Sequence, residues 1–185
     1  MSPFLRENGH ERRTTKNFQE LIRKRYSVRA YKPDPVEEEK LARVLEAARL
    51  APTAANRQPF RVIVLPTKGR EADLRRVYGR DWFTQAPLVL AVCALPAEGW
   101  VRKADGWNAA EVDATIAMAH LILAAAEEGL GTCWIAAFDP AAAREMLGLP
   151  VDVVPAAFTP LGYPADTPAP KKRRLLADLV RRERF

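Results

Sequence analysis

The 185-residue sequence predicts a mixed α/β (α+β) domain, and two kinds of segment carry that prediction. Segments 61–65 and 88–95 are dense in Val, Ile and Leu, as interior strands are. Other segments space their apolar residues as one face of a helix does, and the long Ala-rich stretch 109–128 is typical of a buried helix. Because 48% of the residues are apolar, the chain can build one substantial core. We therefore expect a single domain over 17–185, preceded by a flexible tail over 1–16.

The first half of the chain contains three expected helices. Residues 17–24 place their apolar side chains on one face of a short helix. Asp34 followed by Pro35 is typical of an N-cap and a first helical residue, which predicts a helix over 35–50. Residues 70–78 are expected to form an amphipathic helix between the two strands.

The second half is organised around the apolar stretch 109–128. Its residues are apolar on almost all sides, which predicts a buried central helix that ends at Gly129. His120, within it, is interpreted as a core residue rather than a metal ligand. The other elements expected here are a strand over 130–135, a helix over 141–147 capped by Asp139-Pro140, and a strand over 153–161.

The net charge of +6 comes from the two ends of the chain. Residues 1–32 and 171–185 contain 16 of the 29 Lys and Arg side chains but only five of the 23 acids. If the ends converge, Arg25, Arg29 and the basic run 171–174 could form one anion site. Two solvated tails are the plainer alternative.

The beginning of the chain and its cysteines bear on the cellular location. The first 17 residues lack the apolar core of a secretory signal or a membrane span. Cys93 and Cys133 lie in apolar stretches without the spacing of a zinc site or a disulfide framework, so we expect buried reduced thiols. A cytoplasmic location is therefore expected, with neither a membrane nor a nucleic acid as partner.

Two polar segments near the start are the strongest functional signal. Segment 25–29, Arg-Tyr-Ser-Val-Arg, offers two guanidinium groups and a hydroxyl, donors suited to a phosphate. Segment 52–59 is a proline-bounded polar loop that leads directly into the first strand. No G-x-G-x-x-G or P-loop pattern is present, and with two histidines a metal cluster or a Ser-His-Asp triad is improbable. A bound redox cofactor fits a chain so poor in catalytic side chains.

In these two segments the chain resembles the nitroreductase family of FMN-dependent oxidoreductases. That family carries R-x-S-x-R followed by P-[ST]-x-x-N-x-Q-P-[WF], here at 25–29 and 52–60. Further matching pieces follow in the same order, namely Ala86-Pro87, Asp113, residues 129–135, Phe138-Asp139, residues 161–164 and Lys171-x-Arg173. The resemblance covers most of residues 18–180. It implies a mostly antiparallel central sheet flanked by helices, with a long buried central helix.

The resemblance also implies a site for FMN at a homodimer interface. It assigns the phosphate, the ribityl chain and the pyrimidine edge to one chain, through Arg25, Tyr26 (mainly by its backbone), Ser27, Arg29, Lys171 and Arg173. It assigns a second group to the other subunit, namely Pro52, Thr53, Ala54, Asn56 and Gln58. It places the backbone of Ala136 and Ala137 at the flavin N5 edge. For one further family contact, Arg70, Arg75 and Arg76 are only candidates, and segment 98–107 is a candidate lid.

The implied activity is hydride transfer from NAD(P)H through flavin N5 to a small aromatic acceptor, by a ping-pong mechanism. Nitroaromatics, quinones and free flavins are all acceptors within the family. No side chain acts as a nucleophile and no metal is required. A flavin- or nucleotide-binding protein without turnover is the alternative, and a nucleic-acid-binding module that uses the basic ends is a more distant one.

Overall fold

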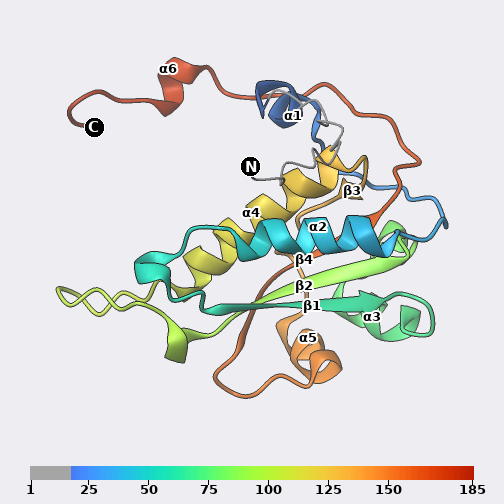
Figure 1. Cartoon of the computed structure of the whole chain (residues 1–185), viewed down its shortest axis with the longest axis horizontal. Coiled ribbons are helices and arrows are strands. Elements are labelled where there is room, and N and C mark those ends of the chain that lie inside the picture. Colours follow the sequence, from blue (N-terminus) through green and yellow to red (C-terminus); the bar gives the residue numbers. More distant parts are fainter. Residues whose placement is uncertain (1–17) are drawn as a thin grey trace, which may run out of the picture.

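A four-stranded antiparallel sheet lies at the centre of the fold (Figure 1). The computed structural model describes residues 18–185, so the tail expected over 1–16 lies outside the described residues. The strand order is β1-β2-β4-β3, where the strands are β1 (Phe60–Pro66), β2 (Leu88–Ala94), β3 (Gly131–Thr132) and β4 (Val154–Gly162). All residues of β2 after the first are buried, which makes it an interior strand. The predicted antiparallel sheet is confirmed.

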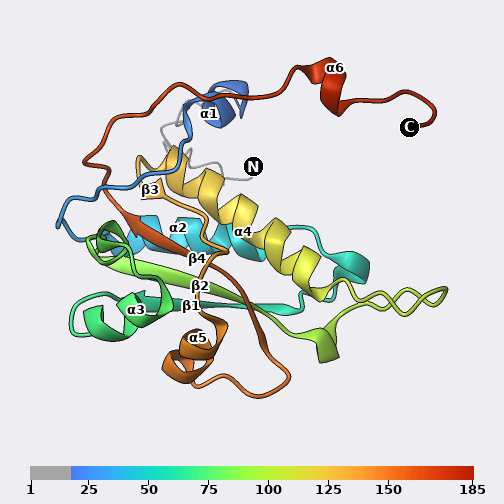
Figure 2. The same ribbon diagram turned by 180° about the vertical axis from the view of Figure 1, so that it is seen from behind.

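Helices cover both faces of this sheet. On one face lie α2 (Glu38–Arg49) and α4 (Ala110–Glu127), and on the other lie α3 (Glu71–Val77) and α5 (Pro140–Leu147). The chain also forms α1 (Phe18–Lys24), α6 (Leu176–Leu179) and three short 3₁₀ helices, η1 (Ala54–Asn56), η2 (Asp81–Thr84) and η3 (Pro96–Glu98). Figure 2 shows the C-terminal segment running past α1 and away from the sheet.

Two hydrophobic clusters fill the space between these layers. Leu90 and Val92 of β2 pack with Met118 of α4 on one face. On the other face, Phe158 of β4 packs with Phe83, and the ring of Phe138 meets that of Phe158 edge-on at 4.9 Å between centroids. Such burial is the main favourable contribution to folding. Within residues 18–185, no helix is long and apolar enough to cross a membrane.

The central helix α4 is buried on one side only, which differs from the expectation of burial all around. The other side carries an apolar stripe of partly or fully exposed residues, Val112, Ile116, Ala119 and Leu123. Val112 is 45% exposed. His120 is half-buried, so its interpretation as a core residue was wrong. Since the composition of α4 suits an interior, the exposed stripe indicates a surface that another molecule can cover.

Two element boundaries differ from the sequence prediction for tertiary reasons. The second helix begins at Glu38, not Pro35, with Glu37 as its N-cap residue. Glu37 there accepts a 2.6 Å hydrogen bond from the hydroxyl of Tyr163, a residue distant in sequence. The predicted strand 130–135 shortens to β3 because the amide of Cys133 donates to the side chain of Thr159 instead of continuing the ladder.

Local signals were accurate where they did not depend on distant residues. Asp139 caps α5, and its Oδ1 accepts hydrogen bonds from the amides of Ala141 (2.8 Å) and Ala142 (3.0 Å). Cys93 and Cys133 are free and buried, as predicted. Burial raises the pKa of the Cys93 thiol to about 11.

We expect Asp139→Ala to lower the free energy of unfolding by about 1 kcal/mol, since it removes both cap hydrogen bonds of α5. Urea unfolding followed by circular dichroism measures the change. Asp139→Ser keeps an acceptor and should recover most of the loss, while exposed Asp152→Ala is the control. Equal stability of the Asp139→Ala chain and the parent would contradict the assignment.

Candidate functional site

The two basic ends of the chain meet in space. The ammonium of Lys171 donates to the carbonyl oxygens of Ile22, at 3.2 Å, and Arg23, at the end of α1. Burial lowers the pKa of Lys171, and the positive charges of Arg25 and Arg173 lower it further. These three cations are therefore close enough to repel one another. The predicted convergence of the ends is confirmed, and the alternative of two separate solvated tails was wrong for this part.

Segment 25–29 is positioned by pairing with β3. The Val28 amide donates to the Thr132 carbonyl at 3.0 Å, and Ser27 forms an isolated parallel bridge with Thr132. A Cβ at Gly131 would lie 2.7 Å from Cγ2 of Val28, so this approach requires a glycine. Arg25 also lines a hollow of about 170 Å³ between this segment and the C-terminal end of α4.

Asp166 ties the segment to the chain that follows β4. The Tyr26 hydroxyl lies 3.0 Å from both the carbonyl oxygen and Oδ1 of Asp166, and the Arg29 amide donates to Oδ2 at 2.7 Å. Burial and the hydrogen bond to Asp166 raise the pKa of Tyr26 to about 12. No local sequence signal points to Asp166, because an acid in a loose Pro-rich stretch fits no helix, strand or motif pattern.

Four positively charged side chains of this region form no ion pair with another described residue. We name this group the cationic cluster, formed by Arg25, Arg29, Lys171 and Arg173. Within residues 18–185, no Asp or Glu makes an ion pair with any of these four side chains. The positive charges of Arg29 and Arg25 also oppose the burial that raises the pKa of the Cys133 thiol. Asp166 lies beside this segment, and it accepts from the Arg29 backbone rather than from a cationic side chain. A group of cations whose side chains form no ion pair with a described residue is suited to a phosphate or another anionic oxygen.

The second group of predicted residues forms a turn before β1, the polar loop, residues 52–58. Ala55, Asn56 and Gln58 have positive φ angles of 51°, 54° and 53°. Such angles are unusual for residues other than glycine and are seen at functional sites. The backbone amide of Gln58 donates to Oγ1 of Thr53 at 3.1 Å. The side-chain Nε2 of Gln58 donates to the backbone carbonyl of Asn56 at 2.8 Å.

In one chain, the polar loop and the cationic cluster lie at opposite ends of α4 (Figures 1 and 2). The loop contacts the first turn of this helix, where the Ala54 amide donates to Asp113. The hollow beside Arg25 is lined by Ala126 and Gly129, at the other end. An 18-residue helix is about 27 Å long. A single chain therefore does not bring the two predicted groups together.

The remaining candidates lie elsewhere. Ala136 and Ala137 are exposed directly after Ile135, which bridges to Phe158 of β4. Arg76 forms a 2.5 Å ion pair with Glu145 of α5. Together with Arg70 and Arg75 it lies at or in α3, on the sheet face opposite α4, so the structure does not bring these three arginines to the cationic cluster.

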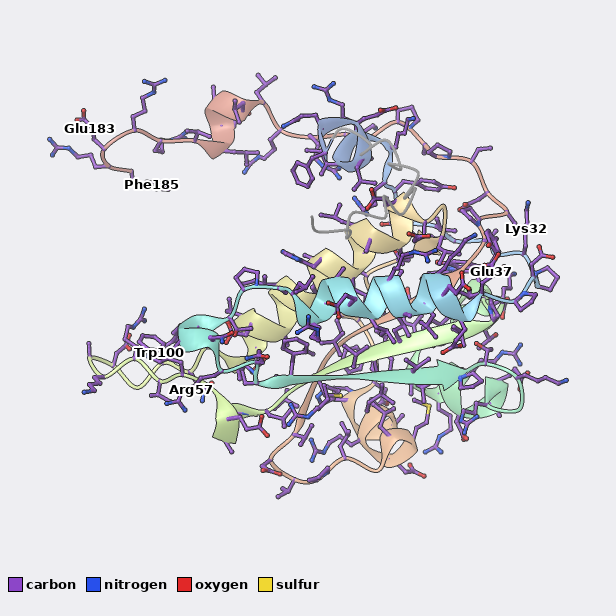
Figure 3. The ribbon with its side chains drawn as sticks, in the orientation of Figure 1. Lys32, Glu37, Arg57, Trp100, Glu183 and Phe185 are labelled. Carbon is purple, nitrogen blue, oxygen red and sulfur yellow. The ribbon has the colours of Figure 1, made fainter. Side chains whose placement is uncertain are left out.

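The candidate lid is a projecting hairpin. Val101 bridges to Asn108, and Arg102 stacks over Trp107 at 5.0 Å while pairing with Asp105 at 2.6 Å. Trp100, at its base, lies at the same end of the molecule as Arg57 of the polar loop (Figure 3). The aromatic and cationic groups thus interact with each other. Among residues 18–185, no three His, Cys, Asp or Glu side chains gather as metal ligands would.

Comparison with known proteins identifies the family of this chain. The sequence model of the nitroreductase family matches residues 22–80 and 70–163. The chain belongs to the nitroreductase family. The predictions of the family and of an oxidoreductase enzyme are thereby confirmed. A crystal structure of a nitroreductase family protein from Clostridium difficile 630 is 37% identical, with a TM-score of 0.85, and the match covers 91% of this chain and 99% of that one.

Two relatives of this chain are named for an enzymatic activity. A Thermus thermophilus protein named NADH dehydrogenase is 32% identical in an alignment 187 residues long. This alignment covers 85% of this chain and 91% of that protein. The FMN reductase (NAD(P)H) of Bacillus subtilis is 34% identical over 163 residues, which cover 80% of this chain and 66% of that protein.

Alkaline pH should reduce the contribution of the Tyr26–Asp166 hydrogen bond to stability. Below pH 10 the phenol is protonated in both the folded and the unfolded chain, so its contribution to stability is fully present. Between pH 10 and about 12 the unfolded phenol ionises first, and this contribution is lost as the pH rises. Urea unfolding at pH 9 and pH 11 should show a larger decrease for the parent than for Tyr26→Phe. Parallel pH dependence of the two chains would contradict it.

Proposed function

We propose that this chain is an NAD(P)H-dependent FMN oxidoreductase that acts as a homodimer. The observation that carries the proposal is the cationic cluster, which is assembled from both ends of the chain and lacks acidic partners within residues 18–185. Cations held this close repel one another, and a bound anion would relieve that repulsion. The names of the Bacillus subtilis and Thermus thermophilus relatives support a flavin and a nicotinamide as the two redox partners.

The cluster fits the phosphate of FMN chemically. Arg25 and Lys171 supply the direct charge, while Ser27 adds a hydroxyl at the same edge of β3. Guanidinium groups bind phosphate oxygens through two parallel hydrogen bonds, and an ammonium group adds a point charge. Arg173 lies close enough to Lys171 to lower its pKa, which supports its assignment to the same phosphate.

The position of the polar loop supports a site shared between two chains. The loop and the cluster are separated by the length of α4, and the exposed stripe of α4 runs between them. In a two-fold symmetric dimer, helices that pack along this stripe in opposite directions bring the loop of one chain to the cluster of its partner. Thr53, Asn56 and Gln58 would then face the flavin from the second subunit, with Pro52 and Ala54 beside them.

When bound, FMN would supply hydride transfer at N5, taking hydride from NAD(P)H and passing it to a small aromatic acceptor in a second half-reaction. The chain's own residues bind and orient. Arg25 and Lys171 neutralise the phosphate, and Arg29 raises the positive potential beside Ser27 and Cys133. The backbone of Ala136 and Ala137 is free of side-chain bulk and can approach a planar ring closely. No side chain of the chain needs to act as a nucleophile.

Two smaller parts of the proposal concern the extent of the domain and the location. Residues 17–185 form one FMN-binding domain. The two free, buried cysteines support a reducing compartment such as the cytoplasm, where disulfides are rare.

The purified protein should be yellow, and NADH or NADPH should bleach the flavin absorbance in stopped-flow measurements. Steady-state rates at several acceptor concentrations should give parallel double-reciprocal lines, as a ping-pong mechanism requires. Nitroaromatics, quinones and free flavins are the acceptors to compare. A yellow protein that NAD(P)H does not reduce would favour the non-catalytic flavin-binding alternative, and a colourless protein that refuses added FMN would overturn the proposal.

Arg25→Ala and Arg173→Ala should each weaken FMN binding by about 1.5–3 kcal/mol, or roughly 10- to 150-fold, as for a lost charge-assisted hydrogen bond. Exposed Lys68→Ala removes one positive charge elsewhere and is the control. Asn56→Ala should also lower occupancy, through the other subunit. In mixed dimers of Arg25→Ala and Asn56→Ala chains, one site in two has neither change and should regain flavin. No recovery would argue against a shared site.

A further inference from the structure

Asp113 is a buried carboxylate that is only half satisfied. It lies in the first turn of α4 and is 2% exposed. Its Oδ1 accepts a hydrogen bond from the Ala54 amide at 3.0 Å. Its Oδ2 is fully buried and receives no hydrogen bond from any residue in the described range 18–185.

We infer that Asp113 is a positioning residue for flavin binding: it fixes the polar loop in its bound-like shape through the single hydrogen bond to Ala54. The inference rests on the proposed function, because the loop is where the second subunit would contact FMN. Asp113 itself is too deeply buried to contact the cofactor.

The hydrogen bond to Ala54 is the loop's attachment to the body of the protein. The other hydrogen bonds of residues 53–57 stay within the loop: they join Thr53, Asn56 and Gln58 to one another, and the Arg57 amide to the Ala54 carbonyl. In the part of the chain that the structure describes, only the bond to Asp113 joins residues 53–57 to another element. Positive φ angles are unfavourable for residues other than glycine, so a hydrogen bond from outside the loop helps to hold it in this shape.

The chemistry of Asp113 is difficult to explain by stability. A buried carboxylate oxygen without a donor opposes folding, and an apolar side chain of similar size would pack at this site at lower cost. The N-terminal end of α4 offsets part of that cost, since negative charge is favoured in the first helical turn. What an apolar residue cannot supply is an acceptor for the Ala54 amide. A preorganised loop lowers the entropic cost of binding a ligand, which is the advantage that we assign to Asp113.

Three variants separate positioning from simple structural support. Asp113→Leu removes the acceptor and fills the space, whereas Asp113→Asn keeps an acceptor at Oδ1 and loses no hydrogen bond at the unpaired Oδ2. Thr67→Val is the matched control, because Thr67 is also buried, with an unpaired Oγ1, at the far end of β1 from the loop. Asp113→Ala replaces the Leu variant if that chain does not fold.

The first measurement needs no cofactor. Trypsin cleavage after the exposed Arg57 in the FMN-free protein reports how firmly the loop is fixed. We expect cleavage to become about tenfold faster in Asp113→Leu, and to stay within about threefold of the parent in Asp113→Asn and Thr67→Val. The thermal midpoint of Asp113→Leu should not fall, because an apolar side chain replaces a half-satisfied carboxylate.

The second measurement is the dissociation constant of FMN, which should rise about tenfold in Asp113→Leu and little in the Asn variant. Unchanged cleavage and affinity in Asp113→Leu would overturn the inference. So would equal losses in the Leu and Asn variants, or failure of both the Leu and Ala chains to fold, since either result indicates a structural requirement. A parent protein that does not bind FMN would contradict the proposed function, while the cleavage of Arg57 would still test Asp113.

Discussion

The pairing of segment 25–29 with β3 is the interaction on which the site depends. The hydrogen bond from Val28 to Thr132 is possible because Gly131 leaves room for the valine side chain. It places Arg25 and Arg29 at the sheet edge, within reach of the segment that leaves β4. Asp166 and Lys171 then attach that segment to the N-terminal part of the chain. Without this pairing, the basic ends would be two unrelated tails.

The electrostatics of the cluster are unfavourable in the isolated chain. Lys171 is partly desolvated and repelled by Arg25 and Arg173, which lowers its pKa. This repulsion opposes folding of the isolated chain. An anion that binds in the cluster relieves the repulsion, which favours binding. Asp113 at the other end of α4 is comparable: its unpaired Oδ2 opposes folding, while its Oδ1 fixes the polar loop. Both ends of this helix therefore carry groups that are costly for folding and useful for a ligand.

The helix α4 also bears on the proposed dimer. Its length separates the polar loop from the cationic cluster within one chain, and its exposed apolar stripe runs between them along the surface. A helix of this composition is expected to be buried on all sides, and in a symmetric dimer it would be. The difference between the expected and the observed burial of α4 is therefore informative, since it marks the surface that a second copy would cover.

The sequence by itself determined the family and the main strands and helices, and it predicted the residue types of the proposed site. These depend on local signals: the apolar runs of β1 and β2, the Asp139 cap of α5 and the order of the two polar motifs. Only the tertiary structure decided where α2 begins, where β3 ends, and which atoms hold the two half-sites in place. Tyr163, Thr159, Asp166 and Asp113 act there through partners 59 to 140 residues away, or 26 in the case of Thr159. Such contacts leave no periodicity or spacing in the sequence, because they form only when distant segments have packed together.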